Sequence, residues 1–318
     1  MIITLTPNPS VDRTVFVDAL PHGTVVRSTK SWSEPSGKGV NVSLALHAHG
    51  IPTSAVLPLG GPVGGQLAQM LTQAGLPFHA TRIAGDTRSN ISLVEPDGTV
   101  TKINEAGPAL TGDETAQLAG AALDVSRGGR WLAACGSLPS GMRADFYALL
   151  LREARRRGLL TAVDSSGPPL HAALDAGPDL IKPNADELAE VAGAELRTLE
   201  DVITAAQRLR SRGARTVLAS LGPDGAVLVD EHGVLYGEAP RVPIVSTVGA
   251  GDALLAGFLA TGGAGREALA AGLRWAAAAV QHHGTLFSGA DDDIPVAITE
   301  DPPTAHLLGT AGAGSGRA

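Results

Sequence analysis

Ser246-Thr247-Val248-Gly249-Ala250-Gly251-Asp252 places two glycines and one carboxylate directly before the apolar segment 253–260. The pattern predicts a helix over that segment, with the glycines at its N-terminus. Glycines there let the backbone N–H groups of residues 249–252 converge without side chains in the way, and the helix dipole adds positive potential. We therefore expect this turn to bind a phosphoryl group.

The carboxylate in this turn predicts a chemical step. If a hydroxyl lies beside the phosphoryl group, Asp252 can accept its proton. The amides of Gly249, Ala250 and Gly251 would stabilise charge on the transferred oxygens. These residues indicate a kinase. The alternative is an ordinary glycine-rich helix start with Asp252 as a first-turn acid.

The composition narrows the class of protein. With 318 residues and 44% hydrophobic content, the chain can bury the core of one large α/β domain or two smaller ones. The net charge of −8 and the absence of a basic block exclude nucleic acid as an expected partner. The single cysteine, Cys135, fits a reducing cytoplasm, and no apolar run has the length of about 18 residues that a membrane span needs.

Short apolar runs alternate with helical segments that end at glycine. The helical patterns cover 40–49, 66–74, 143–157 and 202–212, and the strand patterns cover 2–6, 54–59, 131–135, 159–163, 180–182 and 216–220. Strands that are apolar throughout predict a parallel sheet with helices on both faces. Functional groups should gather where these strands end, at Thr6–Pro9, Gly136-Ser137, Asp164–Gly167, Lys182-Pro183-Asn184 and Ser220-Leu221-Gly222.

Two segments alternate with period two instead. These are 11–18 and 88–104, and the second contains the hairpin turn Pro96-Asp97-Gly98. They predict an antiparallel sheet outside the core that acts as a lid. We expect a core of residues 1–10, 31–85 and 106–305, a β lid of 11–30 and 86–105, and a mobile tail of 306–318. The period-two alternation places Arg88 and Asn90 on one face of their strand, and Lys102 and Asn104 on one face of theirs. It leaves open the register between the two strands.

A second glycine-rich turn, Ser36-Gly37-Lys38-Gly39-Val40-Asn41, also precedes a helical pattern. With both motifs in this order, the sequence resembles the ribokinase-like, phosphofructokinase B family of carbohydrate kinases, and within it the phosphosugar branch. The resemblance runs from Thr4 to beyond Asp252. It implies a three-layer α/β/α core with a mostly parallel sheet, a small β lid, ATP as the phosphoryl donor and Mg²⁺.

The resemblance also implies site residues. On the sugar side they are Asp12, Gly37, Lys38, Asn41, Arg88, Asn90, Lys102 and Ser137, with Arg88 and Asn90 matching a Thr-Arg-X-Asn element that holds the resident phosphate. On the nucleotide side they are Lys182, Asn184, Ser220, Gly222, Gly225 and Thr247, with Asn184 and Glu187 organising magnesium. Plainer alternatives are a solvated Lys38, an exposed Lys102, a capping box at Asn184 and a structural turn at Gly225.

The implied reaction is phosphorylation of a ketohexose monophosphate, D-fructose 1-phosphate above all, by a homodimer that pairs through the lid. Tagatose-6-phosphate kinase and 6-phosphofructokinase activities need the same residues. Arg88 and Ser246 disfavour a neutral sugar. A catalytically silent sugar-phosphate or nucleotide sensor is the alternative from another class. The sequence leaves the roles of His282 and His283 open.

Overall fold

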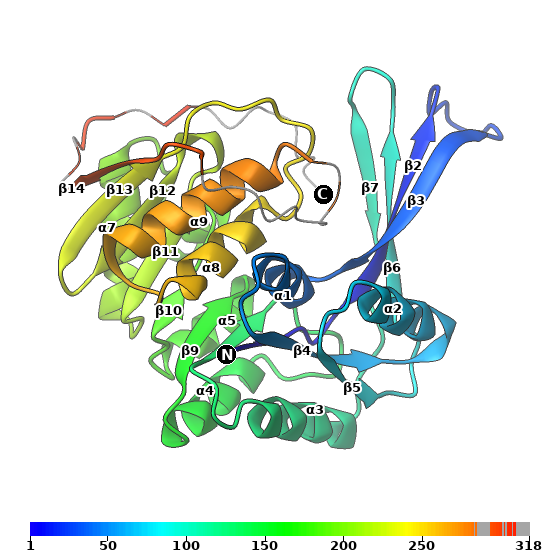
Figure 1. Ribbon diagram of the computed structural model, residues 1–318, viewed down its shortest axis with the longest axis horizontal. Helices are drawn as coiled ribbons and strands as arrows, with labels where there is room; N and C mark the ends of the chain where they lie inside the picture. Colours follow the sequence, from blue (N-terminus) through cyan, green and yellow to red (C-terminus); the bar gives the residue numbers. More distant parts are fainter. Residues whose placement is uncertain (283, 285–292, 301, 303, 307, 310–318) are drawn as a thin grey trace.

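A large sheet forms the centre of the computed structural model, which describes residues 1–282, 284, 293–300, 302, 304–306, 308 and 309 (Figure 1). Its strands are β1 (Ile2–Leu5), β4 (Thr53–Leu59), β5 (Phe78–Arg82), β8 (Trp131–Cys135), β9 (Leu160–Asp164), β10 (Leu180–Ile181), β11 (Thr216–Ser220), β12 (Ala226–Asp230), β13 (Gly233–Glu238) and β14 (Ala297–Glu300).

The sheet has ten strands in the order β14-β13-β12-β11-β10-β9-β8-β1-β4-β5. Neighbours from β11 to β5 are parallel, which confirms the prediction from their continuous apolar runs. The strands from β12 to β14 extend the other edge in antiparallel fashion, which the sequence patterns did not predict.

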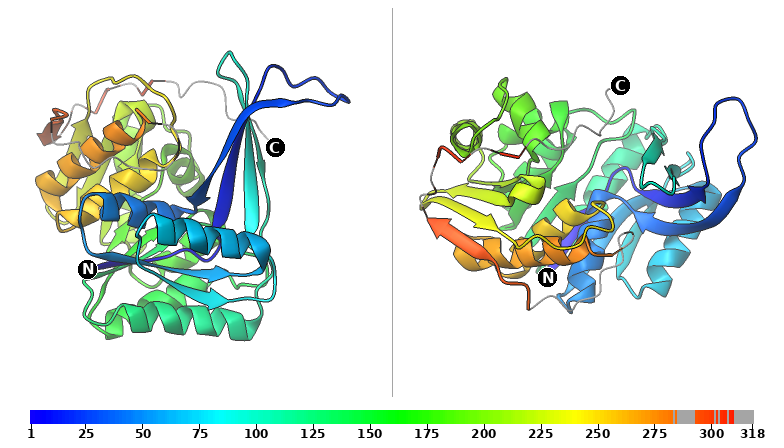
Figure 2. Two further views of the ribbon diagram at one scale, coloured as in Figure 1. Left: turned by 45° about the vertical axis from the view of Figure 1, so that its right-hand side comes forward. Right: turned by 90° about the horizontal axis from the view of Figure 1, so that it is seen from above.

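Helices cover both faces of the sheet, as expected (Figure 2). The first face carries α3 (Gly112–Val125), α4 (Phe146–Arg156), α5 (Gly167–Leu174), α6 (Ala185–Ala192) and α7 (Leu199–Ser211) over one hydrophobic core. The second carries α1 (Lys38–Ala48), α2 (Gly61–Gln73), α8 (Ala250–Ala260) and α9 (Gly265–Ala279) over two further clusters. Among the described residues, no helix is both long and apolar enough to cross a bilayer.

Some helices begin earlier than their apolar periodicity predicts. The helix α7 starts at Leu199 because Thr198 and Asp201 form a capping box upstream of the periodic stretch. The helix α2 starts at Gly61, where Pro62 stands in the first turn and the following glycines contribute no apolar period. A capping box at α7 and a first-turn proline at α2, and not the hydrophobic pattern, therefore mark these boundaries.

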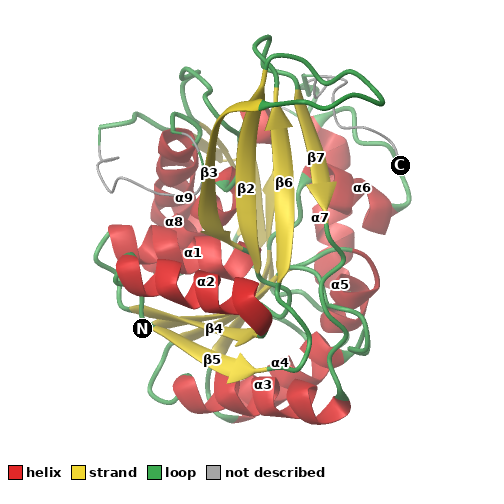
Figure 3. Ribbon diagram, turned by 90° about the vertical axis from the view of Figure 1, so that its right-hand side faces the viewer, coloured by secondary structure: helices red, strands yellow, loops and turns green. Residues whose placement is uncertain are grey.

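A second sheet of four strands projects from the core (Figure 3). It consists of β2 (Ser10–Val17), β3 (Ser28–Ser36), β6 (Arg88–Val94) and β7 (Val100–Asn104), in the order β3-β2-β6-β7. The outer pairs are antiparallel, but the central pair β2 and β6 is parallel, so the prediction of an antiparallel sheet is wrong for that pair. The hairpin turn lies where predicted, because Thr99 O accepts a hydrogen bond from Glu95 N. The register places Asn104 opposite Asn90 and Lys102 opposite Ser92, so these side chains share the face of Arg88.

Part of the segment 306–318 contacts the core. His306 O accepts a hydrogen bond from Leu199 N, and Leu308 N donates one to Arg197 O. Residues 307 and 310–318 of the expected tail, and His283, lie outside the described residues.

Candidate active site

The strand order creates a crevice at the carboxyl ends of the strands of the large sheet. From β1 the chain proceeds to β4 and β5 on one side, and it later returns to β8 on the other side of β1. The loops that follow β1 and β8 therefore diverge, which is where ligands bind in open α/β sheets. A cavity of about 200 Å³ lies there, and its lining residues define the switch-point cavity: Thr6, Asn8, Lys38, Arg88, Gly136, Ser137, Ser165, Ser166 and Glu187.

Lys38 enters the switch-point cavity as the first residue of α1. Gly37 before it has φ 126°, and a Cβ at Gly37 would lie 2.7 Å from Thr6 Cγ2, so only glycine fits this turn. Lys38 Nζ lies 2.7 Å from Asp164 Oδ1 and 3.3 Å from Glu187 Oε1. Burial alone would lower the pKa of Lys38, but these two carboxylates raise it above its ordinary value. Lys38 is thus a cation held by two carboxylates, with its side chain 36% exposed.

Arg88 reaches the same cavity from the lid. Its Nη2 donates to Asn8 O at 3.1 Å, and its Nη1 donates to Glu105 O at 2.9 Å. The Asn8 side chain in turn donates to Ser137 Oγ at 3.3 Å. Because a guanidinium has five N–H donors, Arg88 is held in place with donors left for a ligand. Arg88 and Lys38 therefore line the same cavity.

A polar cluster lies beside Arg88 at the base of the lid. Asp12 Oδ1 accepts hydrogen bonds from Asn90 Nδ2 at 2.8 Å and from Ser10 Oγ at 2.7 Å. Asp12 and Asn90 are directly opposite each other on the parallel pair β2 and β6. Lys102, by contrast, is exposed on β7 and is absent from the cavity lining.

The acid of the first glycine turn is buried. Gly249 caps α8 with φ 82°, a left-handed conformation that favours glycine. Asp252 in the first turn is 8% exposed, and its Oδ2 accepts a hydrogen bond from Asn41 Nδ2 at 2.8 Å. Burial, together with the nearby charge of Asp164, raises the pKa of Asp252 to about 6. A carboxylate with such a pKa is suited to act as a general base near neutral pH.

Lys182 connects the N-terminus of α8 to the cavity. Its Nζ lies 3.0 Å from Asp164 Oδ2, and a Cβ built on Gly251 would be 3.4 Å from the same nitrogen. Burial of Asp164 would raise its pKa, but Lys182 and Lys38 together lower it, so the carboxylate stays charged. Asp164 thus bridges the lysine of the cavity and the lysine beside the helix N-terminus.

Asn184 and Glu187 form a reciprocal capping box at the start of α6. Asn184 Oδ1 accepts from Glu187 N at 2.8 Å, and Glu187 Oε2 accepts from Asn184 N at 2.9 Å. The capping alternative therefore describes their observed contacts. In the described part of the chain, no cluster of three or more His, Cys, Asp or Glu side chains is built to hold a metal. These two oxygen-bearing side chains nevertheless fit a Mg²⁺ ion that takes most of its ligands from phosphates and water.

The remaining residues expected on the nucleotide side lie next to α6 and α8. Ser220 forms a parallel bridge with Asn184, and Thr247 O accepts from Ala250 N at 3.5 Å. Gly222 starts a short 3₁₀ turn. Gly225 has a purely local reason to be glycine, because a Cβ there would lie 2.0 Å from Gly237 O. These positions are compatible with a nucleotide site but do not test it.

Sequence reasoning missed three contributors. Asn8 and Glu105 hold Arg88 through their carbonyl oxygens, which no side-chain pattern could reveal. Asp164 was assigned to the sheet rim without a role. Its signal was a charged residue at the end of an otherwise apolar strand, a position that requires a buried partner.

Comparisons with known proteins agree with this geometry. A sequence model of the family described as pfkB family carbohydrate kinase matches residues 6–292. The chain is 40% identical to a 1-phosphofructokinase of Rhodobacter capsulatus over 81% of this chain and 82% of the relative. It is 35% identical to the ATP-dependent 6-phosphofructokinase isozyme 2 of Escherichia coli, covering 92% and 96%. A crystal structure of Escherichia coli phosphofructokinase-2 with substrates and products superposes with a TM-score of 0.86 at 33% identity, covering 91% and 96%.

Proposed function

The chain belongs to the pfkB family of carbohydrate kinases, and we propose that it transfers the γ-phosphoryl group of ATP to a ketohexose monophosphate. The proposed substrate is D-fructose 1-phosphate, and the product is fructose 1,6-bisphosphate. Relatives named 1-phosphofructokinase, 33–40% identical over about four fifths of this chain, support this substrate.

One observation carries the proposal. Lys38 from the core and Arg88 from the lid line the same cavity, and Asp164 connects that cavity to the N-terminus of α8. A dianionic phosphate is the ligand that two converging cations recognise best. A neutral sugar would leave Arg88, whose direct contacts are carbonyl oxygens, without an anionic partner, which is costly in a partly buried site.

The mechanism follows from the positions of these residues. The resident phosphate binds between Lys38 and Arg88, and Asp12 and Asn90 contact the sugar hydroxyls. Asp252, ionised at neutral pH, accepts the proton of the attacking hydroxyl. The first N–H groups of α8 lack intrahelical partners and stabilise the transferred phosphoryl group. Asn184 and Glu187 would hold Mg²⁺, which would neutralise charge on the ATP phosphates.

The proposal includes a homodimer in the cytoplasm. On the lid face opposite the polar cluster, Ile91 pairs with Ile103, whose side chain is 51% exposed, and β3 and β7 are edge strands. An exposed apolar face with open edges favours pairing with a second copy. We expect Ile103→Lys to convert a dimer into a monomer, as measured by sedimentation velocity. A wild-type protein that sediments as a monomer would contradict the dimer.

The activity is tested by coupled ADP release with fructose 1-phosphate, fructose 6-phosphate and tagatose 6-phosphate. We expect the highest kcat/KM with fructose 1-phosphate. A preference for fructose 6-phosphate would instead assign the activity named for the Escherichia coli relative. Asp252→Asn, purified in parallel, controls for contaminating kinases. Binding of a ketohexose phosphate without turnover would indicate a sensor and contradict the proposal.

A further inference from the structure

Asp164 is a buried carboxylate to which the mechanism above gives no direct role. It ends β9, and its side chain has no exposed surface. Its two oxygens contact two different lysines, Lys38 at 2.7 Å and Lys182 at 3.0 Å. One carboxylate is therefore the counter-ion of a lysine from α1 and of a lysine from the loop after β10.

The two lysines lie on different sides of the site. Lys38 lines the switch-point cavity together with Arg88. Lys182 is 4% exposed and lies beside Gly251 in the first turn of α8. Within the described residues, Lys38 has a second ion pair with Glu187, whereas Asp164 is the single ion-pair partner of Lys182. Loss of the Asp164 charge would therefore leave Lys182 without an ion-pair partner among the described residues, whereas Lys38 would keep Glu187.

We propose that Asp164 is a positioning residue which, as the shared counter-ion of Lys38 and Lys182, makes the phosphosugar affinity at Lys38 depend on Lys182. This inference rests on the proposed function. The positive charge of Lys182 offsets part of the negative potential of Asp164, so loss of Lys182 leaves that potential uncompensated next to Lys38 and its bound phosphate. A substitution on the nucleotide side should therefore weaken phosphate binding on the sugar side.

The first test measures binding without turnover. We expect Lys182→Met to bind fructose 1-phosphate about tenfold more weakly than the wild type in calorimetric titrations without ATP. The double variant Asp164→Asn/Lys182→Met removes both charges of the buried pair, and we expect it to recover most of that loss. Such non-additivity is the signature of a shared partner. Unchanged binding in Lys182→Met, or equal loss in the double variant, would overturn the inference.

A matched control comes from the other end of the same strand. Asp179 accepts hydrogen bonds from Thr161 N and Oγ1, both at 2.9 Å, close to the start of β9. Asp179→Asn also replaces a partly buried carboxylate next to β9, and we expect it to leave fructose 1-phosphate binding within about twofold. Circular dichroism and thermal unfolding of all variants will confirm that each is folded.

A second readout is the pH dependence of turnover. The charged and titratable groups that act on Asp252 are Asp164, Lys38, Lys182 and the buried Cys135. Because the Asp164 charge raises the pKa of Asp252, Asp164→Asn should move the acidic limb of the kcat/KM profile to lower pH. A purely structural role would lower activity without moving that limb.

The two readouts separate this inference from the proposed function. If the wild type releases no ADP but the binding cycle is non-additive, the activity is wrong and the shared counter-ion stands. If the wild type turns over fructose 1-phosphate and Lys182→Met binds it normally, only the shared counter-ion is wrong.

Discussion

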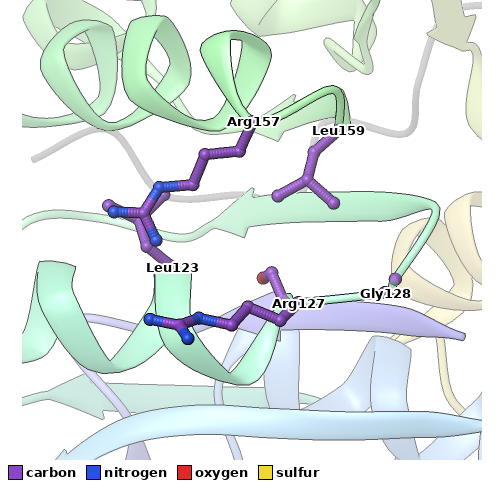
Figure 4. Close-up of a pocket in the computed structure, with 7 residues that line it drawn as sticks. Leu123, Arg127, Gly128, Arg157 and Leu159 are labelled. Atoms are coloured by element: carbon purple, nitrogen blue, oxygen red, sulfur yellow. The ribbon is translucent and has the colours of Figure 1, made fainter.

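Two pockets with paired cations lie at opposite ends of the sheet, and the larger one is not the proposed site. The amino-end pocket, lined by Leu123, Ser126, Arg127, Gly128, Gly129, Arg157 and Leu159, has a volume of about 480 Å³, compared with about 200 Å³ for the switch-point cavity. Figure 4 shows its two arginine side chains extending in the same direction along the pocket. Volume alone would therefore select the end away from the proposed site, and the number of cations, two in each pocket, does not distinguish the pockets.

The partners of the cations distinguish the two regions. In the amino-end pocket, Arg127 pairs with Asp124 at 3.0 Å and Arg157 with Glu153 at 2.9 Å. Both arginines also follow the C-termini of α3 and α4, where the helix dipole itself favours a cation. Arg88 in the switch-point cavity is held by carbonyl oxygens instead of a carboxylate. Lys38 in the same cavity contacts two carboxylates, so Arg88 is the cation whose direct contacts leave its charge unneutralised, and this difference supports the proposed phosphate site.

The largest expected effect is on the chemical step at the switch-point cavity. We expect Asp252→Asn to lower kcat for fructose 1-phosphate by at least about 100-fold, because the general base is lost. Steady-state ADP release measures it. Near-normal turnover would remove Asp252 from its role.

Thermal unfolding is the control for this variant. Since burial raises the pKa of Asp252 to about 6, the ionised side chain costs stability at pH 7, and this cost disappears as the pH falls through 6 towards the unfolded value near 4. Asp252→Asn should therefore be at least as stable as the wild type at pH 7. A variant that unfolds at lower temperature would show that activity was lost with the fold.

The next effect concerns the unneutralised cation. We expect Arg88→Ala to raise the KM for fructose 1-phosphate by about tenfold or more, as loss of a charged hydrogen bond of about 1.5–3 kcal/mol implies. The KM for ATP should change far less, because Arg88 lies on the lid side of the cavity. An unchanged phosphosugar KM would contradict a phosphate site between Arg88 and Lys38.

A smaller effect on kcat/KM is expected from a change in pH. The reaction needs ionised Asp252, so kcat/KM should be flat above pH 6 and fall by about tenfold for each pH unit below it. The direction follows from protonation of the base as the pH decreases. A profile measured with the coupling enzymes in excess that stays flat to pH 5 would exclude Asp252 as the titrating base.

The smallest effect is expected at the amino-end pocket. Arg127→Ala and Arg157→Ala remove cations from exposed ion pairs, so both KM values and kcat should stay within about twofold of the wild type. These variants are also matched controls for Arg88→Ala. A large rise in either KM would show that the larger pocket takes part in substrate binding.

The sequence predicted the parallel core and the lid hairpin, because each depends on local patterns and on strand ends. The assignment of Lys38 and Arg88 to one sugar-phosphate site came from the family resemblance, because the strand patterns left the register of the lid open. The predicted antiparallel lid was wrong for β2 and β6, which pair in parallel, since alternation shows the face of a strand but not its partner or direction. The sequence could not predict the contacts of Asp164 either. Its contact with Lys38 joins residues 126 positions apart, and only the folded sheet brings them together.

The central claim is that the resident phosphate binds between Lys38 and Arg88 at the switch-point end of the sheet. A crystal structure with fructose 1-phosphate and a non-hydrolysable ATP analogue tests it most directly. We expect the sugar phosphate to contact both side chains and the acceptor hydroxyl to lie within hydrogen-bond distance of Asp252. A sugar phosphate found between Arg127 and Arg157 would contradict the account.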